Sequence, residues 1–124
     1  MKQKLSTLFL VSAFAMSLQA QKVTVEIDYG GNKPAETHQT DWYEGMTAQT
    51  ALQHFATIET YPVKNYIFIT TINGIKNDRG VKAWYYTVNG ESTGKLAFRY
   101  NLQPGDTLRW IYKKDVCSKP QKKQ

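Results

Sequence analysis

Outside an apolar stretch at the N-terminus, only one segment of this 124-residue chain has the spacing of an amphipathic helix. Between residues 47 and 56 the apolar side chains recur every three or four positions, at Ala48, Ala51, Leu52, Phe55 and Ala56. Thr47 is a favourable N-cap, and Pro62 prevents the helix from continuing. A chain with one short helix has to build most of its core from strands.

The rest of the body consists of strand-like segments separated by turn residues. Strands are predicted for Lys22–Tyr29, Glu36–Tyr43, Asn65–Ile72, Lys82–Val88 and Thr107–Tyr112, with a short return segment over Leu96–Leu102. The second of these fits a sheet edge, and the third, β-branched and aromatic, is predicted to be a central strand buried on both faces. We therefore predict an α+β, β-grasp-like fold, with one helix packed on a mixed sheet of four to five strands.

Residues 1–20 have the order of a secretory signal peptide. Two lysines precede an uncharged apolar run of about 14 residues, and a small residue, Ala20, precedes Gln21. The run is short for a membrane-spanning helix, which needs about 20 residues. An uncleaved anchor or a buried helix is the alternative. The signal-peptide interpretation predicts a protein that is secreted or periplasmic and carries no transmembrane segment after cleavage.

The formal charge of +6 is unevenly distributed along the chain. Two of these charges belong to the predicted signal peptide, and residues 113–124 hold five lysines against one aspartate. The body between them is balanced. We therefore predict a globular domain over 21–112 and a basic, disordered tail over 113–124. Nucleic acid is not an expected partner, although the tail could attract an anionic polymer of the envelope.

Chemistry-bearing residues are sparse. The histidines are His38 and His54, too few for a metal site without further ligands, and Cys117 is the single cysteine, with no positioned base beside it. Cys117 is interpreted as an inert thiol, with cross-linking of two chains as the alternative. No phosphate loop or zinc signature occurs. We expect no enzymatic activity, no metal and no cofactor.

Two regions are candidates for ligand binding. The aromatic strand places Trp84, Tyr86 and Val88 on one face, which is expected to be core, and Tyr85 and Thr87 on the other, which is either an open ligand-facing surface or an ordinary one. The loop Asn73–Val81 and the turn Asn89–Gly94 are expected to lie at one end of the sheet, with ordinary turn-forming residues as the alternative. The candidate ligand-binding residues are Asn73, Trp84, Tyr85, Thr87, Asn89 and Glu91.

Several motifs together point to a known family. They are Thr71-Ile72-Asn73-Gly74, Ala83-Trp84-Tyr85-Tyr86-Thr87-Val88-Asn89-Gly90-Glu91, Tyr100-Asn101-Leu102-Gln103-Pro104-Gly105-Asp106 and Leu108-Arg109-Trp110-Ile111-Tyr112. Over Lys22 to Tyr112 the chain resembles the transcobalamin-like C-terminal domain, a β-grasp module widely described as a domain of unknown function, and specifically its stand-alone bacterial members.

The resemblance implies a non-enzymatic binding module. In the vitamin B12 carriers this domain acts as a lid over cobalamin, which a separate helical domain holds from below. For this chain the resemblance implies binding of a corrinoid-like or other small molecule together with a partner protein. The alternative is an envelope or extracellular interaction or adhesion module whose open sheet edge pairs with another protein.

Overall fold

The computed structural model describes residues 21–116. The predicted signal peptide and Cys117 therefore lie outside the described residues. The elements in chain order are β1 (Lys22–Asp28), β2 (Glu36–Asp41), α2 (Ala48–Gln53), β3 (Ile58–Val63), β4 (Tyr66–Ile72), β5 (Ile75–Lys76), β6 (Lys82–Val88), the 3-10 turn η1 (Ala97–Arg99) and β7 (Thr107–Lys114). No helix among them is long and apolar enough to cross a membrane.

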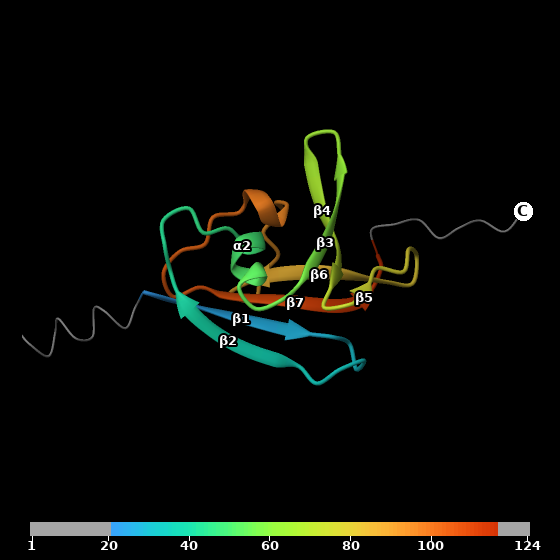
Figure 1. Ribbon diagram of the computed structural model, residues 1–124, viewed down its shortest axis with the longest axis horizontal. Coiled ribbons are helices and arrows are strands. Elements are labelled where there is room, and N and C mark those ends of the chain that lie inside the picture. The colour runs from blue at the N-terminus through green and yellow to red at the C-terminus, as the bar shows by residue number, and fades with distance from the viewer. Residues whose placement is uncertain (1–20, 117–124) are drawn as a thin grey trace, which may run out of the picture.

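Four of the strands form one mixed sheet in the order β2-β1-β7-β6. β1 pairs antiparallel with β2 and parallel with β7, and β6 pairs antiparallel with β7. The helix α2 and the hairpin β3–β4 lie on the same face of this sheet (Figure 1). The predicted α+β arrangement, with one helix on a four-stranded mixed sheet, is confirmed.

The helix is shorter than its apolar stripe. Thr47 caps it as expected: its hydroxyl accepts the Thr50 N–H at 3.1 Å, and the Thr50 hydroxyl accepts the Thr47 N–H at 2.8 Å. The helix ends at Gln53. The N–H groups of Phe55 and Ala56 then both donate to the carbonyl of Leu52, which closes the last turn and directs the chain toward β3.

The core lies between the helix and the covered face of the sheet. The alternating residues of β1 point into it, and Val23, Val25 and Ile27 have no exposed surface. Alternating residues of β6 and β7 complete the layer, and Trp84 retains 7% exposure. The expectation that Trp84 and Val88 belong to the core is confirmed, because the period of two places every second side chain of a strand on the covered face.

The segment predicted as a central strand is instead half of a projecting hairpin. β4 pairs with β3 and, over two residues, with β5, in a separate three-stranded sheet. Tyr66 and Phe68 are exposed, whereas Ile69 and Ile72 at the base are buried. The prediction of burial on both faces was wrong because apolar, β-branched composition does not say whether a neighbouring layer exists to cover the strand.

The loops that we expected at one end of the sheet lie at opposite ends. The loop Asn73–Val81 leads into β6 and the turn Asn89–Gly94 leaves it, so seven strand residues, roughly 20 Å, separate them. The start of the tail was also misplaced. Lys113 and Lys114 belong to β7, and Asp115 is buried, accepting the Gly80 N–H at 2.8 Å. The ordered fold therefore runs beyond residue 112.

Candidate functional site

A pocket of about 440 Å³ lies between the projecting hairpin and the edge strand β6. One wall is Ile67, Phe68 and Ile69 of β4, and the opposite wall is the segment 92–97 that leads into η1. This volume falls within the usual range of small-molecule sites, about 300–1,000 Å³. In Figure 1 the hairpin rises from the sheet beside β6.

Aromatic side chains of the sheet contribute to the pocket lining. Tyr86 and Trp110 come from neighbouring strands, and their ring centroids lie 5.0 Å apart at an interplanar angle of 31°. Trp84 lines the same space, and its indole N–H donates to the carbonyl of Ile75 at 2.8 Å. Because buried rings and a backbone hydrogen bond fix these side chains, the lining is rigid and mainly apolar.

Tyr86 supplies a polar group at the rim. Its hydroxyl lies 2.7 Å from the hydroxyl of Thr93 and donates to the carbonyl of Lys95. Burial raises the pKa of Tyr86 above its ordinary value, and the hydrogen bond with Thr93 opposes that shift in part. The phenol is therefore neutral across the physiological range and ties the segment 92–97 to β6.

Asn77 closes one end of the pocket by bridging two strand edges. Its Oδ1 accepts the Trp84 N–H at 2.8 Å, and its Nδ2 donates to the carbonyl of Ile69 at 3.4 Å. The side-chain amide thus links β6 to β4. It donates to one strand and accepts from the other, as a backbone peptide group does between paired strands. No other side chain in the described part of the chain makes such a bridge between these two strands.

Trp110 carries a second polar feature. Its indole nitrogen is buried and has no hydrogen-bond partner among residues 21–116. A buried donor without an acceptor costs about 1–3 kcal/mol, a cost that a ligand acceptor reaching this nitrogen would remove. Trp110 lines the pocket as a residue, but its indole nitrogen has almost no accessible surface, so a ligand would reach this donor only if the wall moved.

The structure does not bring the six predicted ligand-binding residues together. Trp84 and Tyr85 line the pocket, and Thr87 does not. The Tyr85 hydroxyl donates to Asp115 Oδ1 at 3.2 Å and accepts the Val116 N–H at 3.0 Å, so it joins β6 to the end of β7. Thr87 is half-buried and lies opposite Arg109 in the β6–β7 pair.

Asn73 holds the base of the hairpin. Its Oδ1 accepts the Thr57 N–H at 2.8 Å, and its Nδ2 donates to the buried Tyr29 hydroxyl at 2.7 Å. Its φ of 48° lies in the left-handed region, which asparagine tolerates better than most residues. Asn73 therefore positions the hairpin that forms one wall of the pocket and does not itself line it.

Asn89 and Glu91 lie at the far end of β6. Asn89 Nδ2 donates to Asp106 Oδ1 at 2.9 Å, and Asn89 Oδ1 accepts the Thr107 N–H at 2.9 Å, which braces the turn against β7. Glu91 is exposed and forms a backbone bridge with Val88. Neither residue lines the pocket, although Ser92, Thr93 and Gly94 of the same turn do.

From the sequence no binding role was assigned to the β4 residues that line the pocket, nor to Tyr86 and Trp110 of the sheet. Phe68 was assigned to a buried strand and Tyr86 to the core. A signal for the hairpin was present: Pro62 lacks an N–H and fits an exposed strand edge, and Lys64-Asn65 is a turn dipeptide between two β-branched runs.

The two histidines both lie close to the ring of Phe55, but they do not form a metal site. His38 stacks on Phe55 with ring centroids 4.5 Å apart and lies 3.0 Å from a carboxylate oxygen of Glu36, an interaction that holds the pKa of Glu36 below its ordinary value. His54 lies 3.3 Å from the Tyr43 hydroxyl. Within residues 21–116 no three His, Cys, Asp or Glu side chains gather as a metal site would require.

Two solved structures share this architecture. A protein from Ruminococcus gnavus ATCC 29149, provisionally assigned as metal binding, superposes with a TM-score of 0.65 at 18% identity, covering 77% of this chain and 99% of its own. Haptocorrin, solved in complex with Cbi, superposes with a TM-score of 0.60 at 17% identity, covering 78% of this chain. This chain spans 26% of the haptocorrin chain. At these identities the likeness establishes a transcobalamin-like fold.

Comparison by sequence gives one family match. No curated protein matches this sequence. One family profile, described as Domain of unknown function (DUF4430), matches residues 45–114, from the turn before α2 to the end of β7. That range includes the hairpin, the edge strand and every residue that lines the pocket except Asp115. The chain is thus a member of the DUF4430 family.

Proposed function

We propose that this protein is an exported, non-enzymatic binding module that holds a corrinoid-like or other small flat ligand in the pocket between the β3–β4 hairpin and β6. The observation that carries the proposal is the pocket itself: a rigid aromatic lining from the sheet faced by an exposed apolar hairpin. Rings offer a flat ligand a large contact area at little cost in side-chain freedom. The likeness to haptocorrin, whose structure contains Cbi, supports the corrinoid class.

The size of the pocket bears on how such a ligand would bind. A space of about 440 Å³ takes one edge or one substituent of a corrinoid rather than the whole ring system. The remainder of the ligand would face solvent or a second protein. We therefore expect weak binding by this domain alone and tighter binding when a partner covers the outer face.

The test is isothermal titration calorimetry of the chain from Gln21 onward with cyanocobalamin, comparing wild type with two variants of the hairpin. Phe68→Ser removes an apolar group from the pocket wall, and Tyr61→Ser changes its cross-strand neighbour, which is exposed and outside the pocket. We expect about a tenfold loss of affinity for Phe68→Ser and little change for Tyr61→Ser. Absence of heat at high micromolar cyanocobalamin would remove the proposal that the domain binds a corrinoid alone.

A second function, docking of a partner protein's strand, is favoured by the open edge of β6. The N–H groups of Trp84 and Val88 point away from β7, to Asn77 and to the Glu91 carbonyl, so the backbone of Tyr86 between them also points outward. Within the described residues the Tyr86 backbone has no partner on that side. Unpaired strand edges are templates for strand addition.

Hydrogen exchange and co-purification together separate the two functions. A partner strand that pairs with β6 would protect the amide of Tyr86 from exchange, because that N–H would then donate to the added backbone. A small ligand in the pocket lies against the same strand edge, so protection of Tyr86 counts for strand addition only when a partner protein co-purifies. An envelope extract that gives neither protection of Tyr86 nor a co-purifying protein would exclude strand addition as the function.

A further inference from the structure

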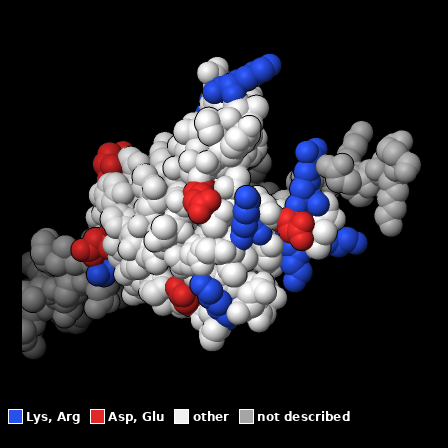
Figure 2. Space-filling view, turned by 45° about the vertical axis from the view of Figure 1, so that its right-hand side comes forward, with Lys and Arg blue, Asp and Glu red and all other residues white. Residues whose placement is uncertain are grey.

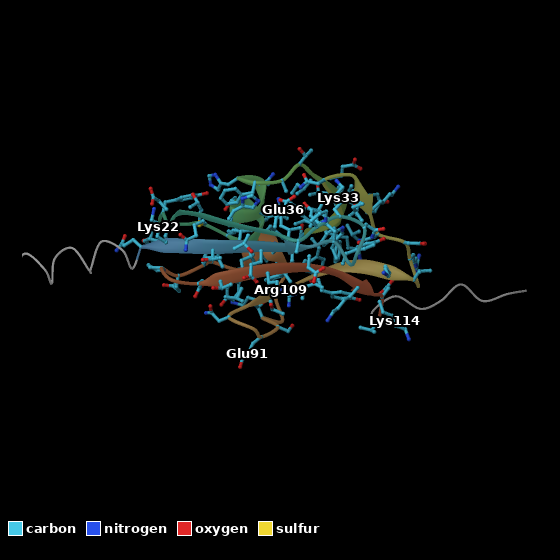
Figure 3. The ribbon with its side chains drawn as sticks, turned by 90° about the horizontal axis from the view of Figure 1, so that it is seen from below. Lys22, Lys33, Glu36, Glu91, Arg109 and Lys114 are labelled. Carbon is cyan, nitrogen blue, oxygen red and sulfur yellow. The ribbon has the colours of Figure 1, made fainter. Side chains whose placement is uncertain are left out.

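Six basic residues gather at the end of the four-stranded sheet where β6 begins and β7 finishes, next to the part of the ligand pocket that Ala83, Tyr85 and Asp115 line. They come from the β1–β2 turn, the end of β5, the loop after it, the start of β6 and the last residues of β7: Lys33, Lys76, Arg79, Lys82, Lys113 and Lys114. Figure 2 shows a group of Lys and Arg side chains, with acidic atoms among them, on the right-hand side of the view. In Figure 3 Lys33 and Lys114 lie toward this end, and Lys22 lies at the other.

The fold neutralises this basic end only in part, because Lys33 interacts electrostatically with Glu36 at the start of β2. Among residues 21–116 the ion pairs of lysine and arginine join Lys22 to Asp41 and Arg109 to Glu26 and Asp28, and none involves the six basic residues. Two aspartates lie here. Asp115 is buried and hydrogen-bonded, and Asp78 is exposed at the rim of a polar depression of about 310 Å³ that Lys76 and Lys82 also line.

Like charges even face each other across the strands. Lys82 lies directly opposite Lys114 in the β6–β7 register. Like charges in directly opposed positions destabilise a sheet, whereas the corresponding position at the other end of the sheet pairs Lys22 with Asp41 at 2.7 Å. The basic end thus retains a repulsion that a single substitution would relieve.

Tyrosine rings lie beneath several of these cations. The ammonium groups of Lys33, Lys82 and Lys113 lie 5.4, 5.9 and 5.3 Å from the ring centroids of Tyr29, Tyr112 and Tyr85. These contacts restrain the lysine side chains without reducing their charge. The cations are therefore held at the surface and available to an external anion.

Apolar side chains are exposed at the same end. Val81 is 55% exposed and Val116 is 73% exposed, and the two segments are joined by the hydrogen bond from the Asp115 N–H to the Val81 carbonyl at 3.0 Å. Basic and exposed apolar residues are therefore combined on one surface.

We propose that this basic end docks the protein on the surface of an anionic lipid bilayer. Lysines near such a surface each contribute about 1 kcal/mol of attraction, which corresponds to a factor of about five in binding. A soluble polyanion would need only the charges, whereas a bilayer also accepts apolar side chains at the headgroup boundary. The two exposed valines favour the bilayer.

The test is co-sedimentation with vesicles of pure phosphatidylcholine or of phosphatidylcholine containing about one third phosphatidylglycerol. The protein is the chain from Gln21 onward, which contains the whole described fold and lacks the apolar N-terminal stretch. We expect binding to the anionic vesicles alone, weakening as salt is added. The double substitution Lys76→Glu and Lys114→Glu should lower the partition coefficient at least tenfold.

Two controls make the result decisive. Lys64→Glu at the hairpin tip makes the same change in charge as Lys76→Glu alone, and an equal loss from both would show that net charge, not the basic end, drives binding. Val81→Ser with Val116→Ser should weaken vesicle binding and leave retention on dextran sulfate unchanged. Binding to dextran sulfate without binding to anionic vesicles would overturn the bilayer proposal in favour of an anionic polymer. Thermal unfolding of each variant checks that the fold persists.

Discussion

The four-stranded sheet and the β3–β4 hairpin are built from similar β-branched and aromatic residues but differ in what covers them. In the sheet, Val25 and Ile27 of β1 have no exposed surface, because α2 and the hairpin base pack over them. In the hairpin, Tyr61 is 64% exposed and Tyr66 is 47% exposed. Strand composition therefore predicts a strand but not its burial, and the uncovered strand pair is the one that forms a wall of the ligand pocket.

The largest expected effect is a loss of unfolding free energy that is greater for a substitution in the sheet than for one in the hairpin. Ile27→Ala in β1 should cost about 2–5 kcal/mol, since it leaves a cavity in the buried layer. Phe68→Ala in β4 should cost less than that, because the side chain is already 41% exposed. Urea unfolding followed by tryptophan fluorescence measures both. Equal losses would mean that the hairpin is as much a part of the core as the sheet.

The next largest loss of stability is expected at Asn73, which connects the base of the hairpin to the sheet. Asn73→Ala removes the acceptor for Thr57 and the donor to Tyr29 and leaves an unfavourable φ, so we expect a loss of about 1–3 kcal/mol. Asn73→Gly relieves the backbone cost alone and should recover part of the loss. If the glycine variant restores full stability, the hydrogen bonds of Asn73 do not hold the hairpin.

A smaller effect is expected where the hairpin tip meets η1. Arg99 donates to the carbonyl of Asn65 at 3.1 Å and lies 5.3 Å from the ring centroid of Tyr66. Because this contact is exposed, Arg99→Ala should change global stability by less than about 1 kcal/mol. The amides of β3 and β4 should nevertheless exchange faster with solvent, and β1 amides should not. Unchanged exchange at the hairpin would show that its base alone supports it.

The buried tyrosines should not change the free energy of unfolding at neutral pH, because they are un-ionised there. Their ionisation should lower it only in alkaline solution. Burial raises the pKa of Tyr29, Tyr86 and Tyr112 above the ordinary value of 10.0. Their neutral forms stabilise the fold fully below pH 10, and this contribution is lost as the pH rises through the folded-state values. Urea titrations on either side of pH 10 should show the fall. Tyr86→Phe should reduce its slope, and an unchanged slope would contradict the assignment of Tyr86.

The sequence predicts the local elements of the fold well and their tertiary arrangement poorly. The strands from Lys22 and Lys82, the Thr47 cap and the last strand are found near their predicted bounds, because alternation and capping are local properties. β3 was missed because Pro62 was interpreted only as a helix stop. The candidate site was predicted least well: Asn73 and Asn89 bear turn chemistry, but they flank opposite ends of β6, and the predicted strand Lys82–Val88 already contained that separation.

The same limit applies to charge. Counting residues correctly gave a balanced body, but balance along a chain does not mean balance over a surface. Lys82 and Lys114 are far apart in the sequence and directly opposed in the sheet. The tilt of the hairpin, which opens the pocket, is likewise a tertiary property that no periodicity of β4 contains.

The parallel pairing of β1 with β7 has a consequence for the order in which the molecule is made. The first and last strands of the described fold are neighbours at the centre of the sheet, so the buried layer cannot close until nearly the whole domain has been synthesised. Such distant pairing slows folding, because the chain must bring its ends together before their contacts stabilise it. A growing chain that lacks β7 would hold β1–β2 and β3–β4 as separate hairpins. For a protein that we propose to be exported, late closure keeps the emerging chain open until translation is almost complete.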